Sequence, residues 1–244
     1  MRKLKRWAFA SGAVQNMRDL GGYVCDGGMT KYGVVLRSDQ LHGLAQDEIE
    51  LLKACGLTDV IDLRSEGERN QVVNDFLNDD QVTVHACETG HNVDAKQFDP
   101  TLFDNMGDMY LAMVDVNGNA YVDMVRIVAR AKGMCIVHCM AGKDRTGIIC
   151  SLILSALGVE EGDIVADYQI SEVHNMRNVM LVKFISESPE HIRYLARSQS
   201  ENMFKLLAHW NEKYGGALNY LKRHGFTDED LNALKARMVT AIED

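Results

Sequence analysis

The residue types best suited to chemistry lie in one short segment, in which five residues separate Cys139 from Arg145 and Thr146 follows at once. Five intervening residues let successive N–H groups curl around an anion the size of phosphate, and a following helix would add positive charge at its N-terminus. The same donors stabilise a thiolate, so Cys139 is predicted to be nucleophilic at neutral pH. Arg145 supplies a planar fork for two phosphate oxygens. The spacing therefore predicts phosphoryl transfer to a cysteine.

Two neighbouring residues complete this candidate site. Thr146 can donate a hydroxyl hydrogen bond to the Cys139 sulfur, which would ease the departure of the sulfur when a phosphocysteine is hydrolysed. His138 is expected to orient the loop through hydrogen bonds rather than to transfer protons. A buried cysteine beside an incidental arginine is the plainer alternative, but four matching positions rarely coincide by chance.

Other interpretations of the same segment fit less well. A Walker A phosphate loop requires Ser or Thr after its Gly-Lys pair, where this chain has Asp144, and it requires an earlier glycine that is absent. A zinc site would need CxxC or HxxxH spacing, which this segment lacks. The nearest candidate ligands are Cys135, His138, Cys139 and Cys150. No metal and no organic cofactor is therefore expected.

The segment lies between a predicted strand and a predicted helix. The run from Met134 to His138 is continuously apolar, which is typical of a central strand covered on both faces. From Thr146 to Leu157 the sequence is apolar nearly all round and ends at Gly158, which predicts a buried helix. The strand would therefore deliver Cys139 to the amino end of that helix.

Further strands and helices alternate along the chain, which predicts parallel strands with helices on both faces. The predicted strands are 33–36, 59–63, 81–86 and 134–138, and the predicted helices are 46–55, 121–132, 146–157, 162–175, much of 179–214, 217–223 and 228–242. We expect an α/β fold with a central, mostly parallel sheet, additional C-terminal helices, and catalytic groups at the carboxyl ends of the strands. Because the chain has two prolines and no linker-like tract, residues 1–244 are expected to form a single domain.

The amino-acid composition excludes two kinds of partner, nucleic acid and the interior of a membrane. The chain has 244 residues, with 26 basic and 35 acidic side chains and a formal net charge of −9. Nucleic acid is not expected as a partner, because no basic stripe is present to displace phosphate counterions. No apolar run approaches the ~18 residues of a membrane helix, so stable membrane insertion is not expected. The six cysteines show no disulfide pattern, so we expect a cytoplasmic protein with reduced thiols.

The amino-terminal segment leaves export open. Residues 1–6 are rich in basic side chains, and the short apolar stretch 7–14 loosely resembles a signal peptide. Ser11 and Gly12 interrupt that stretch, so an edge strand bearing basic residues is the preferred interpretation.

The sequence His-Cys-Met-Ala-Gly-Lys-Asp-Arg-Thr-Gly at 138–147 resembles the signature of the cysteine-dependent protein tyrosine phosphatase superfamily. Its Gly-Lys-Asp-Arg-Thr-Gly part is similar to that of a bacterial tyrosine/serine phosphatase branch, which includes secreted mycobacterial and listerial enzymes that act on phosphoproteins and phosphoinositides. The segment 16–23 resembles the Asn-x-Arg-Asp-Leu-Gly-Gly motif of the same branch. Shorter similarities are found at 36–39, 62–66 and 167–168, and the resemblance is weakest over 88–125 and 179–214.

The resemblance implies a role for each matching residue. Cys139 corresponds to the nucleophile and Arg145 to the phosphate-binding arginine. The residues between them would offer backbone N–H groups to the phosphate, and these are Met140, Ala141, Gly142 and Lys143. Lys143 also adds a positive charge, which in related loops accompanies tolerance of phosphoinositide headgroups. The resemblance further implies a helical lid over the site within about 179–214.

A general acid must protonate the leaving oxygen. The Trp-Pro-Asp segment used by many eukaryotic tyrosine phosphatases is absent from this chain. Asp144, inside the loop, is the first candidate. Asp62, near the carboxyl end of a predicted strand, is the second candidate, and the sequence leaves both open.

The other motifs carry charged pairs that we expect to brace loops through hydrogen bonds rather than to line the pocket. These pairs are Arg18 with Asp19, Arg37 with Asp39, and Arg64 with Glu66 or Glu68. Asp167 and Tyr168 are expected to be ordinary helix residues. The methionine and aromatic side chains between 179 and 214 are expected to belong to the core.

We therefore expect a metal-independent phosphomonoesterase that works through a phosphocysteine. Its substrate would be a phosphoprotein bearing phosphotyrosine, with dual specificity open, and its product would be phosphate. Phosphoinositide hydrolysis is the nearest alternative. A phosphate-binding module without activity is the alternative from a different class, and intact Cys139 and Arg145 argue against it. Arsenate reductases share the Cys-x5-Arg spacing, but the rest of this chain does not resemble them.

Overall fold

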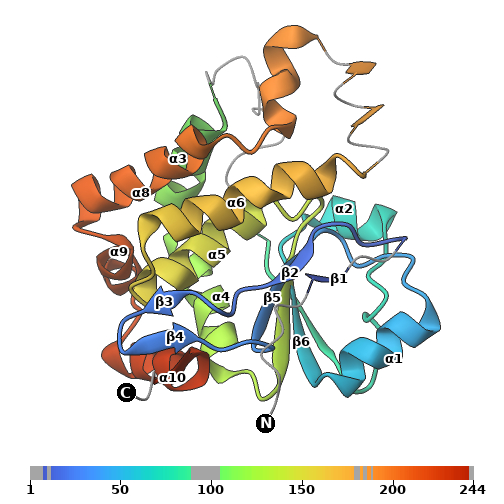
Figure 1. Ribbon diagram of the computed structural model, residues 1–244, viewed down its shortest axis with the longest axis horizontal. Helices are drawn as coiled ribbons and strands as arrows, with labels where there is room; N and C mark the ends of the chain where they lie inside the picture. The colour runs from blue at the N-terminus through green and yellow to red at the C-terminus, as the bar shows by residue number, and fades with distance from the viewer. Residues whose placement is uncertain are drawn as a thin grey trace.

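The computed structural model describes residues 8–9, 12–88, 105–178, 182–183, 186–187 and 189–241. A six-stranded sheet runs through the molecule (Figure 1). Across it the strands lie in the order β1 (Ala8–Phe9), β2 (Met17–Asp19), β5 (Val35–Ser38), β8 (Met134–His138), β6 (Leu57–Asp62) and β7 (Thr83–Ala86). The last four are parallel, and β1 and β2 extend the sheet antiparallel at one edge. The sheet is therefore mostly parallel, as predicted.

The carboxyl ends of the three central strands lie level with one another. Ser38 at the end of β5 and Asp62 at the end of β6 are both in register with His138 at the end of β8. The segments that follow these strands therefore meet at one edge of the sheet, where α/β folds place their sites. Cys139 is the first residue beyond β8 at this edge.

Two apolar cores cover the two faces of the sheet. Alternate residues of a strand point to opposite faces. Accordingly, Cys135 and Val137 of β8 belong to the larger core, whereas Met134 and Ile136 belong to the smaller one. A strand buried on both faces needs no polar alternation, which explains the continuous apolar run in the sequence.

The larger core is covered by helices that lie beyond residue 105 of the chain. These are α3 (Met106–Val116), α4 (Gly118–Arg130), α5 (Asp144–Ala156), α6 (Glu161–Asn175), α8 (Ser200–Tyr214), α9 (Ala217–Arg223) and α10 (Asp228–Met238). On the other face α1 (Gln46–Ala54) packs through Leu52, and α2 (Glu66–Gln71) follows β6. Across the described ranges, none of the helices combines the length and the hydropathy needed to span a bilayer.

The carboxyl-terminal helix is shorter than predicted. Instead of running over 228–242, α10 ends at Met238, and β9 (Val239–Thr240) pairs with β4 (Gly28–Thr30) in a small sheet that also holds β3 (Val24–Cys25). β-Branched Val239 and Thr240 favour extended backbone, and the edge of β4 offers them ladder partners that a longer helix would leave unpaired. Ile242 lies outside the described residues.

The stretch 179–214 is only partly the helix predicted. Helix α8 accounts for its end, and Glu190–Ala196 forms a 3-10 helix, η2. Met203 and Trp210 of α8 are fully buried, which confirms the predicted core role, whereas Phe204 is about half exposed. Met180 and Phe184, which belong to the same apolar pattern, lie outside the described residues.

Candidate active site

The loop from Cys139 to Arg145 joins β8 to α5 and bends at Gly142. Gly142 has a φ of 65°, in the left-handed region that glycine adopts without strain. A Cβ at this position would lie 2.4 Å from the carbonyl oxygen of Ser38, so the loop can press against the end of β5 only with glycine here. Arg145 falls in the first turn of α5, a helix of 13 residues whose N-terminus adds partial positive charge.

Neighbouring segments hold the carbonyl groups of this loop on its outer side. The Gln40 amide donates to the Met140 carbonyl at 3.1 Å. Asn16 Nδ2 donates to the carbonyl oxygens of Ala141 at 2.9 Å and Gly142 at 3.1 Å. Carbonyl groups turned outward leave the N–H groups facing the interior of the loop, and these amides have no acceptor within the described part of the chain. The loop is therefore an array of donors suited to an anion.

A buried ion-pair network lies behind the loop. Asp167 of α6 accepts hydrogen bonds from Arg18 Nε at 3.1 Å and from Arg37 Nη1. Arg37 Nη2 in turn donates to the Gly142 carbonyl at 2.8 Å, and Arg18 Nη1 donates to Asn16 Oδ1 at 2.6 Å. The three charged side chains are at most 4% exposed. The network therefore fixes both side chains that hold the loop carbonyls.

This network carries a net positive charge beneath the loop. Burial acts to raise the pKa of Asp167, but the charges and hydrogen bonds of Arg37 and Arg18 lower it below its usual value. Burial, together with the charge of Arg37, lowers the pKa of Arg18 to about 10. Two arginines and one aspartate are therefore all charged at neutral pH, and the excess charge favours an anion in the loop.

Asp167→Asn is expected to lower the free energy of unfolding by about 3 kcal/mol at pH 7, because it leaves two buried guanidinium groups without a counter-charge. Urea unfolding measures this loss. The native pKa of Asp167 is depressed, so its contribution is present above the pKa of an unfolded aspartate and is lost as the pH falls through the native value. The difference between the two proteins should therefore shrink in acid.

Asp115→Asn is the matched control for that prediction. Asp115 pairs with Lys213 and His209 at a partly exposed position, where an ion pair contributes about 1 kcal/mol or less. Equal destabilisation by the two substitutions would contradict the role assigned to the buried network.

Both arginines bind a partner other than the one predicted. Arg18 and Arg37 share Asp167, not the adjacent Asp19 and Asp39. The adjacent carboxylates already accept backbone N–H groups: Asp19 accepts that of Gly21 at 2.8 Å, and Asp39 accepts that of Asn16 at 2.9 Å. Backbone amides therefore occupy the carboxylates of Asp19 and Asp39. Asp167, expected to be an ordinary helix residue, is the centre of the network.

Arg145 is held by Glu68 of α2. Arg145 Nη1 and Nη2 donate to the two carboxylate oxygens of Glu68 at 2.6 and 2.8 Å. Burial acts to raise the pKa of Glu68, but hydrogen bonds from Arg145 and Ser65 lower it to about 2. Arg145 Nε has no acceptor among the described residues, so Nε–H and the second Nη2–H form a free edge with two parallel donors.

The pairing of Arg64 also differs from the prediction. Arg64 binds Asp62, with Nε and Nη2 at 2.9 and 2.7 Å from its two oxygens, instead of Glu66 or Glu68. Glu68 was therefore missed as the partner of Arg145. The one sequence signal was its capping box with Ser65, which fixes the start of α2 and thereby the Glu68 backbone.

Asp144 and Asp62, the two candidate acids, lie in different surroundings. Asp62 is completely buried in its ion pair with Arg64. Burial acts to raise the pKa of Asp62, but hydrogen bonds from His138 and Arg64 bring it well below its usual value. Asp144 begins α5, its side chain is 24% exposed, and its Oδ1 accepts a hydrogen bond from Tyr110 Oη at 2.5 Å. Of the two, Asp144 alone is accessible.

The remaining predicted site residues surround the loop. His138 is fully buried, with Nδ1 3.2 Å from the Cys139 carbonyl and Nε2 2.9 Å from Asn74 Nδ2, so its ring contacts the backbone at the start of the loop. Thr146 is also buried, and its hydroxyl has no hydrogen-bond partner among the residues described.

Lys143 points away from the interior of the loop. Its ammonium donates to the carbonyl oxygens of Leu195 at 2.5 Å and Arg197 at 3.0 Å, and it lies 3.3 Å from Asp144 Oδ1. Its side chain is 3% exposed. The Lys143 charge is therefore bound by the end of η2 and by the residue that follows it, which lie against the loop.

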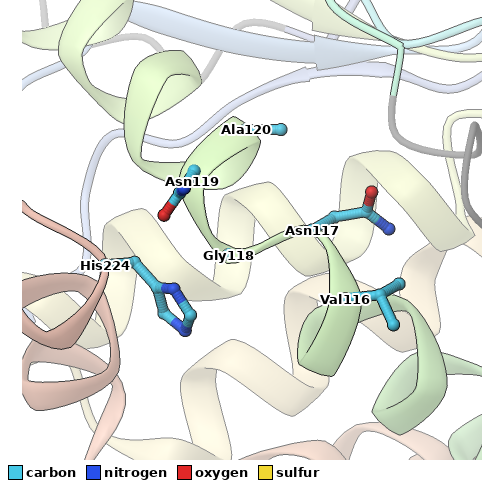
Figure 2. Close-up of a pocket in the computed structure, with 6 residues that line it drawn as sticks. All are labelled: Val116, Asn117, Gly118, Asn119, Ala120 and His224. Atoms are coloured by element: carbon cyan, nitrogen blue, oxygen red, sulfur yellow. The ribbon is translucent and has the colours of Figure 1, made fainter.

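A pocket at the turn between α3 and α4 is separate from this site (Figure 2). Its lining includes Asn117, Gly118 and His224, and the His224 ring packs so closely over Gly118 that a Cβ there would lie 2.4 Å from it. The pocket shares no residue with the Cys139 loop or its supports.

Comparison with known proteins places this geometry in a family. Residues 10–240 match the sequence model of the tyrosine phosphatase family. A tyrosine-protein phosphatase of Nostoc commune is 28% identical over 218 residues, which cover 83% of this chain and 73% of that protein. The triple specificity protein phosphatase PtpB of Mycobacterium tuberculosis is 27% identical over an alignment of 248 residues, covering 83% of this chain and 90% of that protein. Because the match runs through every element that builds the loop, the chain belongs to the tyrosine phosphatase family.

Proposed function

We propose that this phosphatase hydrolyses phosphotyrosine in proteins through a phosphocysteine formed on Cys139. The observation that carries the proposal is the arrangement of donors around this residue. The loop amides face inward without acceptors, and the free edge of Arg145 adds two parallel N–H groups. Such an arrangement binds three equatorial oxygens of a phosphoryl group and neutralises their charge.

In the first step the Cys139 thiolate attacks phosphorus, so that a P–S bond forms as the P–O bond to the tyrosine breaks. Asp144 gives its proton to the departing oxygen, which leaves as a neutral phenol. Arg145 and the loop amides hold the transferring group in line between sulfur and oxygen. Burial acts to lower the pKa of Arg145, but its hydrogen bond with Glu68 and the charges of Cys139 and Glu68 raise that pKa above its usual value, so the guanidinium stays charged throughout.

In the second step water attacks the phosphocysteine. The Asp144 carboxylate accepts a proton from that water, the P–S bond breaks, and phosphate and the Cys139 thiolate are released. Protons balance over the cycle, because Asp144 regains the one it gave. The reaction draws on no metal and no organic cofactor.

Two observations favour phosphotyrosine over the alternatives. Cys139 is only 2% exposed, so a phosphate on a long, flat side chain reaches it more readily than one on serine. Lys143, whose charge would suit a phosphoinositide headgroup, is bound to the carbonyls of Leu195 and Arg197. Phosphoinositides are therefore ranked second as substrates.

The test measures phosphate release from a phosphotyrosine peptide, a phosphoserine peptide and phosphoinositide vesicles, with EDTA present and Cys139→Ser as the blank. We expect release to be fastest from the phosphotyrosine peptide. Acid quenching during turnover, followed by mass spectrometry of the peptides, should place one phosphate on Cys139.

Three outcomes would count against the proposal. Turnover that leaves no phosphate on Cys139 would contradict the mechanism. Faster hydrolysis of the vesicles would replace the substrate class with phosphoinositides. No release from folded, reduced protein would favour a phosphate-binding module instead.

A further inference from the structure

A chain of hydrogen bonds from three helices ends on Asp144. Tyr110 of α3 has its Oη 2.5 Å from Asp144 Oδ1, and Tyr168 of α6 has its Oη 2.7 Å from that of Tyr110. Asn202 of α8 forms a side-chain hydrogen bond with Tyr168 and accepts the Gly107 amide on its Oδ1 at 3.1 Å. Residues of three helices are thus linked, through Tyr110, to one oxygen of the proposed acid.

The direction of the chain follows from counting donors. Asn202 Oδ1 accepts the Gly107 amide, and Asn202 Nδ2 is the donor left for Tyr168, because the hydroxyl hydrogen of Tyr168 is needed by Tyr110. Each tyrosine has one hydroxyl hydrogen. When Asp144 is ionised, Tyr110 must donate to it, and Tyr168 must therefore donate to Tyr110. Every hydrogen bond then points towards Asp144.

The chain is rigid because its members are buried. Tyr110, Tyr168 and Asn202 are at most 2% exposed, and the two rings meet edge to face with centroids 6.1 Å apart. Gly147, in the first turn of α5, leaves space for the Tyr168 ring, since a Cβ at this position would lie 3.1 Å from the ring. Burial and the neighbouring Asp144 raise the pKa of Tyr110 well above its usual value, so it remains a donor.

All the contacts of Asp144 within the described residues fall on Oδ1. We propose that Tyr110, Tyr168 and Asn202 are positioning residues that fix Oδ1 of Asp144, so that Oδ2 carries the proton to the leaving group. This inference rests on the proposed function, in which Asp144 is the general acid. The three residues touch no substrate; they act through Asp144.

The test compares kcat/KM for a series of aryl phosphates whose leaving groups span several units of pKa. A good leaving group departs without a proton, whereas a poor one depends on the acid. Tyr110→Phe is therefore expected to leave kcat/KM for the best leaving group nearly unchanged and to lower it about tenfold for the poorest. Tyr168→Phe should show a smaller loss of the same kind, and it tests the chain if the Tyr110 variant does not fold.

Tyr220→Phe is the matched control. Tyr220 is equally buried and donates to the Val114 carbonyl at 2.6 Å, outside the chain. This variant should show the leaving-group dependence of the unchanged protein. A uniform loss across the series in Tyr110→Phe would overturn the inference, because it would indicate a merely structural role.

Asp144→Asn separates this inference from the proposed function. It should show the steepest leaving-group dependence, and adding Tyr110→Phe to it should cause no further leaving-group-dependent loss. If the loss of kcat/KM in Asp144→Asn depends on the leaving group and the loss in Tyr110→Phe does not, the positioning role of the three residues is refuted. The assignment of Asp144 as the general acid is then retained. If Asp144→Asn itself shows no such dependence, the assignment of the acid fails.

Discussion

Cys139→Ser is expected to lower kcat/KM for an aryl phosphate by on the order of 10⁵-fold, because a serine hydroxyl is a much weaker nucleophile than the cysteine sulfur on which the phosphocysteine would form. Binding of a phosphotyrosine peptide should be retained in this variant. The amides of the loop and the free edge of Arg145 are untouched by the change, and they supply the contacts to phosphate. Initial rates measure the first effect, and calorimetric titration with a phosphotyrosine peptide measures the second.

Cys150→Ala serves as the control for that substitution. Cys150 lies in α5, is 1% exposed, and burial raises its pKa to about 12, so it is not a nucleophile at neutral pH. This variant should keep most of the activity. A Cys139→Ser protein that stays active would contradict the mechanism. Phosphopeptide binding by both proteins, with neither showing activity, would instead support a binding module.

The strand and loop that carry Cys139 could be predicted because their signals are local. A strand buried on both faces must be apolar throughout, and β8 begins and ends at the predicted residues, Met134 and His138. The predicted helix after the loop, 146–157, is α5 (Asp144–Ala156), which begins inside the loop. Backbone geometry and hydrophobicity determine both elements, and both can be read from neighbouring residues.

The supports of the loop could not be predicted in the same way, because their partners are distant in sequence. Arg18 and Asp167 are 149 positions apart, and Arg145 and Glu68 are 77 apart. Every acidic residue near an arginine is an equally good partner until the fold is known. The sequence therefore indicated that arginines brace loops, but not which carboxylates they bind.

The same reasoning explains why Tyr110 was missed. Its helix, α3, lies in the region where the family resemblance is weakest, and its ring reaches Asp144 only because α3 and α6 both pack against α8, and α6 packs against α5. Periodicity can assign such a tyrosine to a core. It does not predict which polar group the tyrosine hydroxyl contacts in the folded protein.

Arg145→Lys is expected to lower kcat/KM by on the order of 10⁴-fold while the positive charge is retained. Lysine offers a single point of charge, whereas Arg145 presents two parallel donors to phosphate on one edge and binds both oxygens of Glu68 on another. A lysine at this position would pair with Glu68 and leave the equatorial oxygens of the transferring group without donors. The loss should therefore fall mainly on kcat, since these donors matter most in the transition state.

Glu68→Gln tests whether activity needs the position of the Arg145 guanidinium as well as its positive charge. The amide oxygen of glutamine still accepts from one Arg145 nitrogen, but its NH₂ group faces the other, so the guanidinium loses half of its support. We expect activity to fall about tenfold, between the unchanged protein and Arg145→Lys. Steady-state kinetics of the three proteins gives the order. If Arg145→Lys were as active as the unchanged protein, positive charge alone would be enough, and the two-donor edge would have no role in catalysis.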